Sequence, residues 1–254
     1  MLIVISPAKK LDYKTPVPID KYTIPDFLNH SKILVDILKE ASIETLTKLM
    51  NISYGLAELN LKRFNNWSLP FTPENARQAL FAFKGDVYEA MKTYQLNNDA
   101  ILFAQEHLRI ISGLYGLLRP LDLIQPYRLP MGTKLKNPFG KDLYAFWSSL
   151  ITETLNKIMA EKKYPFILNL ASNEYFKAID TKLLKYPVIS VVFKEEKNGV
   201  YRVISFKAKR ARGFMCNYIL TNNITDIQGV KAFNYEGYKF SPEQSTENKL
   251  VFLR

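Results

Sequence analysis

The chain has 254 residues, of which 47% are hydrophobic and 23% charged, and its formal net charge is +11. This composition is typical of a well-packed globular protein and excludes a disordered or collagen-like chain. No apolar stretch approaches the ~18 residues of a membrane span, and a lone cysteine, Cys216, excludes an internal disulfide. With only His30 and His107, a zinc site of Cys and His is excluded too, and we expect no metal and no cofactor. The first residues lack the basic region of a signal peptide, so we expect a cytoplasmic protein without a membrane partner.

The amino-terminal two thirds of the chain is predicted to be mainly helical. The apolar run Leu2–Ile5 predicts a buried strand. Asp26 is expected to cap a helix whose apolar residues recur at helical spacing as far as Leu38. Further helices are expected at 43–50, 54–64, 72–83, 98–111 and 142–162. The helix at 72–83 is placed by its Thr-Pro-Glu start, and the helix at 98–111 by a cap at Asn98 and a closing Gly113.

The carboxyl-terminal third is predicted to be richer in strands. Residues 166–170 form a buried apolar run, and two β-branched runs at 188–193 and 200–206 flank an Asn-Gly pair, which predicts a hairpin. A helix is expected over 208–221, with short strands near 237–240 and 249–253. No linker or repeat interrupts the chain. We therefore predict one compact α+β domain over 1–254, in which helices wrap a central mixed sheet that includes the amino-terminal strand.

The positive charge is unevenly distributed along the chain. Residues 1–100 carry a net charge of +1, whereas residues 101–254 carry +10. Such an excess is typical of a surface that meets a polyanion, and nucleic acid is the first candidate. A solvated basic face without a partner explains the same charge equally well.

The segment Ser6–Asp12 directly follows the first strand, where open α/β sheets usually place ligands. Ser6 and Lys9 are three residues apart, the spacing of a serine nucleophile and its lysine base in penicillin-binding enzymes. The companion motifs of those enzymes are absent. Binding of an anion by Lys9 is favoured over serine chemistry, and an ordinary loop explains the segment as well.

The segment from Ile111 to Arg128 contains two glycines, Gly113 and Gly116, between stretches predicted to be helical, and Arg119 follows them. A glycine hairpin between two helices is the design of helix-hairpin-helix modules, which bind the DNA backbone through turn amides. The spacing here is Gly-x-x-Gly rather than Gly-x-Gly. On the local sequence alone, a helix end followed by a simple turn is favoured over this module.

A basic cluster follows the predicted hairpin and contains Lys207, Lys209, Arg210 and Arg212. Cations near a helix amino terminus oppose the helix dipole, and a sequence that keeps this conflict often does so at a functional site. We therefore predict that the cluster binds an anion such as a phosphate, with a solvated basic turn as the alternative.

The segment Asn169–Lys177 follows the predicted strand at 166–170 and is expected to open a short helix. Glu174 and Lys177 in this segment are either an exposed helical pair or an acid–base pair at the end of the strand, and the first interpretation is favoured. The chain has no P-loop, no dinucleotide-binding glycine motif and no His-Glu-x-x-His motif, which excludes the common functions that these motifs mark.

Taken together, these segments resemble the YaaA family, also called UPF0246 or DUF328. The resemblance spans nearly the whole chain and rests on the stretches 5–12, 71–79, 82–88, 107–132, 169–177, 209–213 and 233–238. One departure is Pro130, where relatives have Glu in the run before Met-Gly.

The resemblance implies a cytoplasmic bacterial protein that protects cells from hydrogen peroxide by limiting free iron. It also implies a helix-hairpin-helix, carried over onto Gly113–Arg119, and a basic cleft that binds double-stranded or distorted DNA with little sequence preference. The cleft carries over onto Lys9, Arg128 and the cluster at 207–212. An enzyme acting on DNA or a nucleotide, with Ser6, Lys9, Glu174 and Lys177 in the cleft, is the alternative; an iron-binding protein is a third, weaker one. The sequence does not specify the oligomeric state.

Overall fold

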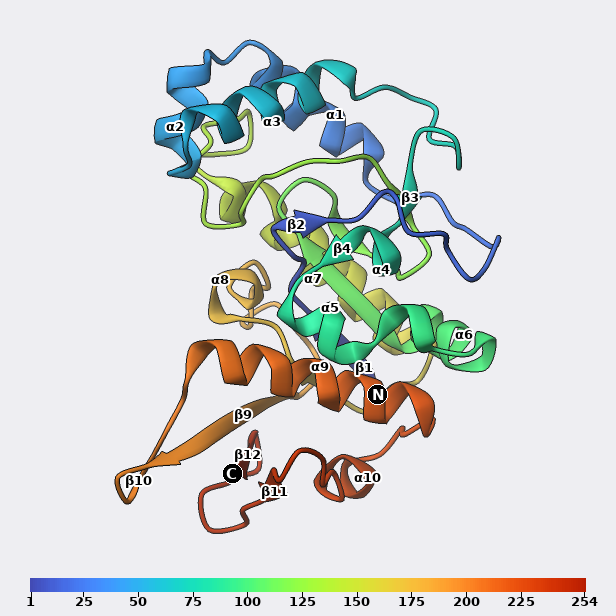
Figure 1. Ribbon diagram of the computed structural model, residues 1–254, viewed down its shortest axis with the longest axis vertical. Coiled ribbons are helices and arrows are strands. Elements are labelled where there is room, and N and C mark those ends of the chain that lie inside the picture. Colours follow the sequence, from blue (N-terminus) through green and yellow to red (C-terminus); the bar gives the residue numbers. More distant parts are fainter.

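A mixed sheet runs through the centre of the computed structural model, which describes residues 1–254 (Figure 1). The strands lie in the order β11 (Lys239–Phe240), β12 (Lys249–Leu253), β9 (Val188–Lys197), β8 (Ile167–Asn169), β1 (Leu2–Ile5), β5 (Leu108–Ser112) and β6 (Gly116–Leu118), and β10 (Val200–Arg202) pairs with β9. The pairs β12–β9, β9–β8, β8–β1 and β1–β5 are parallel, and β6, β10 and β11 are added antiparallel. This arrangement confirms the predicted α+β fold with a central mixed sheet.

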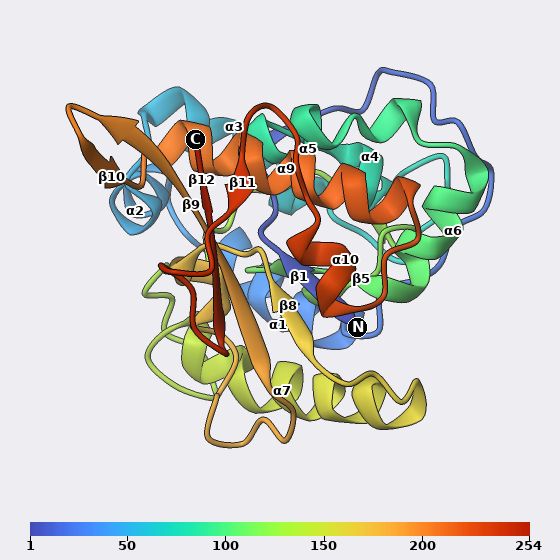
Figure 2. The same ribbon diagram turned by 90° about the horizontal axis from the view of Figure 1, so that it is seen from below.

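Helices cover both faces of the sheet (Figure 2). The long α7 (Leu143–Glu161) lies on one face, and α9 (Ser205–Thr221), α5 (Asp86–Met91) and α6 (Asn98–His107) lie on the other. A further layer at one end of the molecule consists of α1 (Leu28–Lys39), α2 (Ile43–Met50) and α3 (Tyr54–Asn66) (Figure 1). The remaining short elements are β2 (Lys10–Leu11), β3 (Arg77–Gln78), α4 (Ala79–Ala82), β4 (Phe83–Lys84), the 3-10 turn Thr93–Gln95, β7 (Leu123–Ile124), α8 (Asn173–Phe176) and α10 (Ile227–Lys231).

Several elements form where the local sequence predicts them. All four residues of β1 are buried, as expected for a continuous apolar run. Asp142 caps α7 by accepting a hydrogen bond from the Ala145 N–H at 2.9 Å. The β9–β10 hairpin turns at Asn198 and Gly199, which both have positive φ angles, as a two-residue Asn-Gly turn requires.

The helix predicted over 72–83 is wrong: only the four residues of α4 are helical, and β3 and β4 flank them. Hydrogen bonds to distant segments explain the difference. Arg77 pairs with Ile124 of β7, and the Gln78 side chain donates to the carbonyls of Ile19 and Lys21. These tertiary contacts outweigh the helix-start signal, which acts only locally.

The helix predicted over 98–111 ends at His107, and its last apolar residues form β5 instead. Asn97, rather than Asn98, caps the helix by accepting from the Ala100 N–H at 2.9 Å. The run from Leu108 to Ser112 is wholly buried beside β1. A short buried apolar run fits a helix or a strand equally well by periodicity, and here the parallel pairing with β1 decides.

The predicted helix-hairpin-helix at Gly113–Arg119 is a β-hairpin that joins β5 to β6. Its turn amides are not available to DNA, because the Ser112 hydroxyl accepts from the N–H groups of Leu114 and Tyr115. The Gly113 carbonyl accepts from the Trp147 indole at 2.9 Å. Gly116 has a φ of +70°, and a Cβ there would lie 2.7 Å from the Trp147 ring. The glycines thus serve a tight, buried turn.

Candidate functional site

The carboxyl ends of β1 and β8 meet in a pair of serines. Because the two strands are parallel neighbours, the residues that leave them lie side by side. The Ser172 N–H donates to the Ser6 Oγ at 2.9 Å, and the Ser6 hydroxyl donates to the Ser172 Oγ at 3.2 Å. Ser172 precedes α8 without making a side-chain cap, which leaves its hydroxyl for Ser6. The site therefore begins as a hydroxyl pair on neighbouring strands.

Three tyrosines lie close to this pair. Tyr88 of α5 donates to the Ser6 carbonyl at 3.0 Å, and the Tyr127 hydroxyl pairs with that of Ser112, at the end of β5, at 2.7 Å. Burial raises the pKa of Tyr88 and Tyr175 well above the ordinary value of a phenol. The hydroxyls of Tyr127 and Tyr175 lie near enough to Tyr88 to raise its pKa further. These phenols remain protonated and serve as hydrogen-bond donors.

Ser6 and Lys9 do not form a nucleophile and base, which agrees with the low weight that serine chemistry received from the sequence. The segment between them is not helical, and Lys9 is exposed without an ion pair or a side-chain hydrogen bond. The chain instead continues into β2, where Lys10 pairs with Lys84 of β4. Ala8, the residue before Lys9, lies close to Gly85, which precedes α5.

Glu174 and Lys177 both have structural partners. The Glu174 carboxylate accepts a hydrogen bond from the Gly132 N–H at 3.1 Å. The backbone carbonyl of Glu174 accepts one from the Tyr144 hydroxyl at 2.9 Å. Lys177 lies over the ring of Tyr144, with its Nζ 5.2 Å from the ring centre. The two side chains form neither the exposed pair favoured by the sequence nor an acid–base pair with Ser6.

The basic cluster lies on the first turns of α9, as predicted, and its cations differ in what they contact. Lys207 pairs with the buried Glu195 at 2.7 Å. Lys209 and Arg210 are exposed and without a carboxylate partner, and Arg210 lies over the Phe214 ring at 5.5 Å. Arg212 is half-buried and has no ion pair, and burial lowers the pKa of its guanidinium.

Charges of this region also act on the tyrosines near the serine pair. The Arg212 charge lowers the pKa of Cys216 one turn later, although burial raises it overall, and Cys216 adds to the raised pKa of Tyr88. Tyr175 also adds to the raised pKa of Tyr88, and the Arg128 charge acts to lower the pKa of Tyr175.

Arg119, the last residue of the predicted DNA-binding set, lies elsewhere in a network of its own. Its guanidinium forms ion pairs with Asp122 at 2.9 Å and Asp26 at 3.1 Å, and it donates to the Ile24 carbonyl at 2.6 Å. The Asp26 carboxylate therefore does not cap α1, which begins after Phe27. Because these carboxylates neutralise its charge, Arg119 stabilises the loop before α1 and is not poised to bind an anion.

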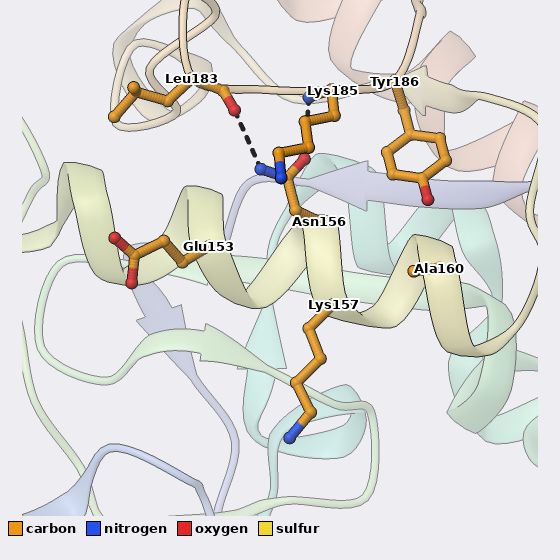
Figure 3. Close-up of a pocket in the computed structure, with 7 residues that line it drawn as sticks. All are labelled: Glu153, Asn156, Lys157, Ala160, Leu183, Lys185 and Tyr186. Atoms are coloured by element: carbon orange, nitrogen blue, oxygen red, sulfur yellow. Dashed lines mark hydrogen bonds between the residues drawn. The ribbon is translucent and has the colours of Figure 1, made fainter.

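A hollow of about 590 Å³ lies between α7 and the segment at 183–186 (Figure 3). The Asn156 side chain ties that segment to the helix: it donates to the Leu183 carbonyl at 2.9 Å and accepts from the Lys185 N–H at 2.8 Å (Figure 3). None of the predicted site residues lines it. A second hollow, of about 290 Å³, is lined by Asp12, Lys84 and Tyr88 among others, on the side where Lys9 lies.

Sequence analysis missed the tyrosines Tyr88, Tyr127 and Tyr175. The chain holds 15 tyrosines, and nothing in their local sequence separates these from the rest. It also missed Arg63 and Arg77, which lie near Arg128. Among the described side chains, no group of three or more His, Cys, Asp or Glu is arranged to hold a metal ion.

The fold defines an α+β protein with a central mixed sheet, and a cluster of basic residues lies on the first turns of α9. Residues 1–244 match the family described as peroxide stress protein YaaA, and the chain belongs to this family. A UPF0246 protein of Alteromonas mediterranea is 52% identical over 254 residues, which cover 100% of this chain and 98% of the relative. A UPF0246 protein of Polynucleobacter asymbioticus is 51% identical over the same length and with the same coverage. No helix has the length and apolar character needed to cross a membrane.

Proposed function

We propose that this chain acts in peroxide stress by binding double-stranded or distorted DNA through phosphate contacts made by α9. The observation that carries the proposal is the set of cations on that helix without carboxylate partners, Lys209, Arg210 and the half-buried Arg212. The proposal adds Lys9, which is exposed and has no ion pair. The family membership supports the peroxide-stress role, and the charges support the partner.

Phosphate contacts release counterions, so binding should weaken steeply with salt and should differ little between sequences. Fluorescence anisotropy with an intact and a bulged duplex of the same length, across a salt series, measures both properties. A flat salt response, or no binding at low salt, would contradict the proposal.

Charge reversal at the two exposed cations, Lys209→Glu with Arg210→Glu, tests which face binds. If each side chain contacts a phosphate, the slope of log K against log salt falls by about 2. The matched control is Lys157→Glu on α7, on the opposite face of the sheet (Figure 2), where the slope should not change. A loss in the control about half as large as in the double variant would mean that binding follows net charge rather than α9, because the control changes the net charge by half as much.

The proposal also includes a lower level of free iron in the cytoplasm of cells that contain this protein. Family membership is its support, and Cys216, a buried free thiol whose pKa burial raises to about 12, suits a reducing compartment. Electron paramagnetic resonance of chelator-accessible iron in whole cells with and without the gene tests it. Equal signals after peroxide exposure would contradict this part and leave DNA binding untouched.

A further inference from the structure

Three arginines without a carboxylate partner, Arg63, Arg77 and Arg128, lie in one region of the fold. Arg77 on β3 pairs with Ile124 on β7, and the Tyr13 hydroxyl donates to the carbonyl of this same Ile124 at 2.7 Å. Arg128 follows β7 in the chain, and Arg63 comes from α3, which lies at the same end of the molecule as β3 (Figure 1). The charges of Arg63 and Arg77 act on Tyr13, and the charge of Arg128 acts on Arg63, so segments distant in the sequence meet here.

The electrostatics of the group are consistent with this proximity. The charges of Arg63 and Arg77 both act to lower the pKa of Tyr13, which burial raises strongly. The charge of Arg128 adds to burial in lowering the pKa of Arg63. Arg63 and Arg128 therefore repel each other within the folded protein.

Almost all the donors of these three side chains lack a partner. The Nε atoms of Arg77 and Arg128 are buried without any hydrogen bond, and the only other such side-chain atom in the protein is the Thr47 hydroxyl. Arg63 makes a single bond, to the Asn60 side chain at 3.3 Å. Each guanidinium carries about five N–H donors, and buried donors without partners are rare in folded proteins.

Asp12, the carboxylate next to Tyr13 in the chain, is already engaged within its own loop. Asp12 accepts from the N–H groups of Lys14 and Thr15 at 2.9 and 3.0 Å and pairs with Lys84. Asp12 and Arg77 both act on the pKa of Tyr94, which the Asp12 charge raises and the Arg77 charge lowers. Asp12 nevertheless forms no ion pair with an arginine. The three positive charges are thus left without a counter-charge from the protein.

We propose that Arg63, Arg77 and Arg128 form a site for a terminal phosphate, as found in inorganic phosphate, a nucleoside monophosphate or the phosphorylated end of a DNA strand. Arginine suits phosphate because its planar fork donates two parallel hydrogen bonds. Three neighbouring cations match a dianionic phosphate better than the single charge of a phosphodiester in a DNA backbone. This site is separate from the exposed face of α9 and does not rest on the proposed DNA binding.

The test is calorimetry of the whole protein with inorganic phosphate at constant ionic strength. We expect binding to the wild-type chain, and Arg77→Gln and Arg128→Gln should each weaken it at least about tenfold, since each removes a charged donor. Arg202→Gln, an exposed arginine on β10, is the matched control and should bind as the wild type does. No binding by the wild type, or equal binding by all four proteins, overturns the proposal.

A second measurement covers the case in which a variant folds poorly. Phosphate should raise the unfolding temperature of the wild type and of Arg202→Gln, and should raise that of Arg128→Lys less, because lysine keeps the charge but not the fork. Full stabilisation of Arg128→Lys together with Arg128→Gln would overturn the proposal.

The source of the phosphate is distinguished by competition. A nucleoside monophosphate that displaces inorganic phosphate indicates a small-molecule ligand. Displacement by a duplex with a 5′-phosphate, but not by the same duplex without it, indicates a DNA end. Displacement by both duplexes alike contradicts a terminal-phosphate site. Loss of DNA binding on charge reversal of α9, with phosphate binding retained, separates this site from the proposed function.

Discussion

Arg119 and Arg128 lie on either side of β7 in the chain and have opposite surroundings. Arg119 forms ion pairs with Asp122 and Asp26, so its charge is neutralised within the fold. Arg128 has a buried Nε without a partner and another guanidinium, that of Arg63, nearby. The comparison teaches that a basic sequence motif does not identify a binding residue until the acids around it are known.

A structural arginine need not have carboxylates, as Arg109 shows. Its guanidinium is buried, and it donates to the backbone carbonyls of Gln105, Glu106 and Leu108. The structural arginines thus have either carboxylates or backbone carbonyls as hydrogen-bond partners. Arg77 and Arg128 have neither kind of partner. That contrast is what the experiments below test.

The largest expected effect comes from Asp122→Asn, which leaves Arg119 without its buried partner. Asp122 is fully buried and accepts from Thr23 and from both the backbone and the side chain of Arg119. Removal of one member of a buried pair leaves an uncompensated charge, so we expect a loss of about 3 kcal/mol in the free energy of unfolding. Urea unfolding at pH 7 measures it.

The control for this variant is Asp26→Asn, the exposed partner of the same arginine. It should cost less than about 1 kcal/mol, because exposed pairs are screened by solvent. Equal losses at the two positions would show that burial does not decide the strength of this network.

The next effect is a pH dependence at Asp12, the engaged acid near the arginine cluster. Hydrogen bonds from the backbone N–H groups of Thr15 and Lys14 hold the pKa of this carboxyl well below its usual range. The ionised form therefore stabilises the folded state above the unfolded pKa of about 4, and this contribution is lost as the pH falls towards the folded pKa.

Asp12→Asn should thus destabilise the protein at pH 6 and cost less at pH 3. Urea midpoints of the two proteins at both pH values measure the change. A difference that stays constant between pH 6 and pH 3 would mean that the carboxylate is not held in its charged form by the loop.

Much of the fold could be predicted from the sequence because its signals are local. The Asn198-Gly199 turn, the cap at Asp142 and the buried run of β1 depend on neighbouring residues alone. The helix predicted over 72–83 failed because tertiary hydrogen bonds decide that segment, such as those of the Gln78 amide to Ile19 and Lys21. Local propensity is a weak signal against such contacts.

The candidate site was predictable only in part for the same reason. The cluster on α9 is contiguous in the sequence, and it lies on a helix as expected. The three arginines of the proposed phosphate site come from α3, β3 and the segment after β7, so only the folded chain brings them together. The ion pairs of Arg119 could be foreseen only in part, because Asp122 is three residues away but Asp26 is distant in the sequence.

A smaller effect is expected at Arg77→Gln, the variant that should weaken phosphate binding. Since this side chain has no ion pair and lies among other cations, its loss should change the free energy of unfolding by less than about 1 kcal/mol in phosphate-free buffer. Arg109→Gln is the control and should cost about 2 kcal/mol, because it leaves buried carbonyls without donors. Urea unfolding of the two variants decides whether Arg77 is structural.

The smallest effect is expected where two opposite charges meet on the surface, between Lys32 and Asp36 of α1. Their Nζ–Oδ2 distance is 2.6 Å, shorter than either ion pair of Arg119, yet both side chains are more than half exposed. A double-mutant cycle with Lys32→Ala and Asp36→Ala should give a coupling of about 0.3 kcal/mol. The coupling should shrink further at 1 M salt, where the Debye length is about 3 Å. A coupling as large as the loss at Asp122 would mean that the distance between the charges, rather than their burial, sets the strength of an ion pair. The burial of the Arg128 Nε without a carboxylate would then be weaker support for a phosphate ligand.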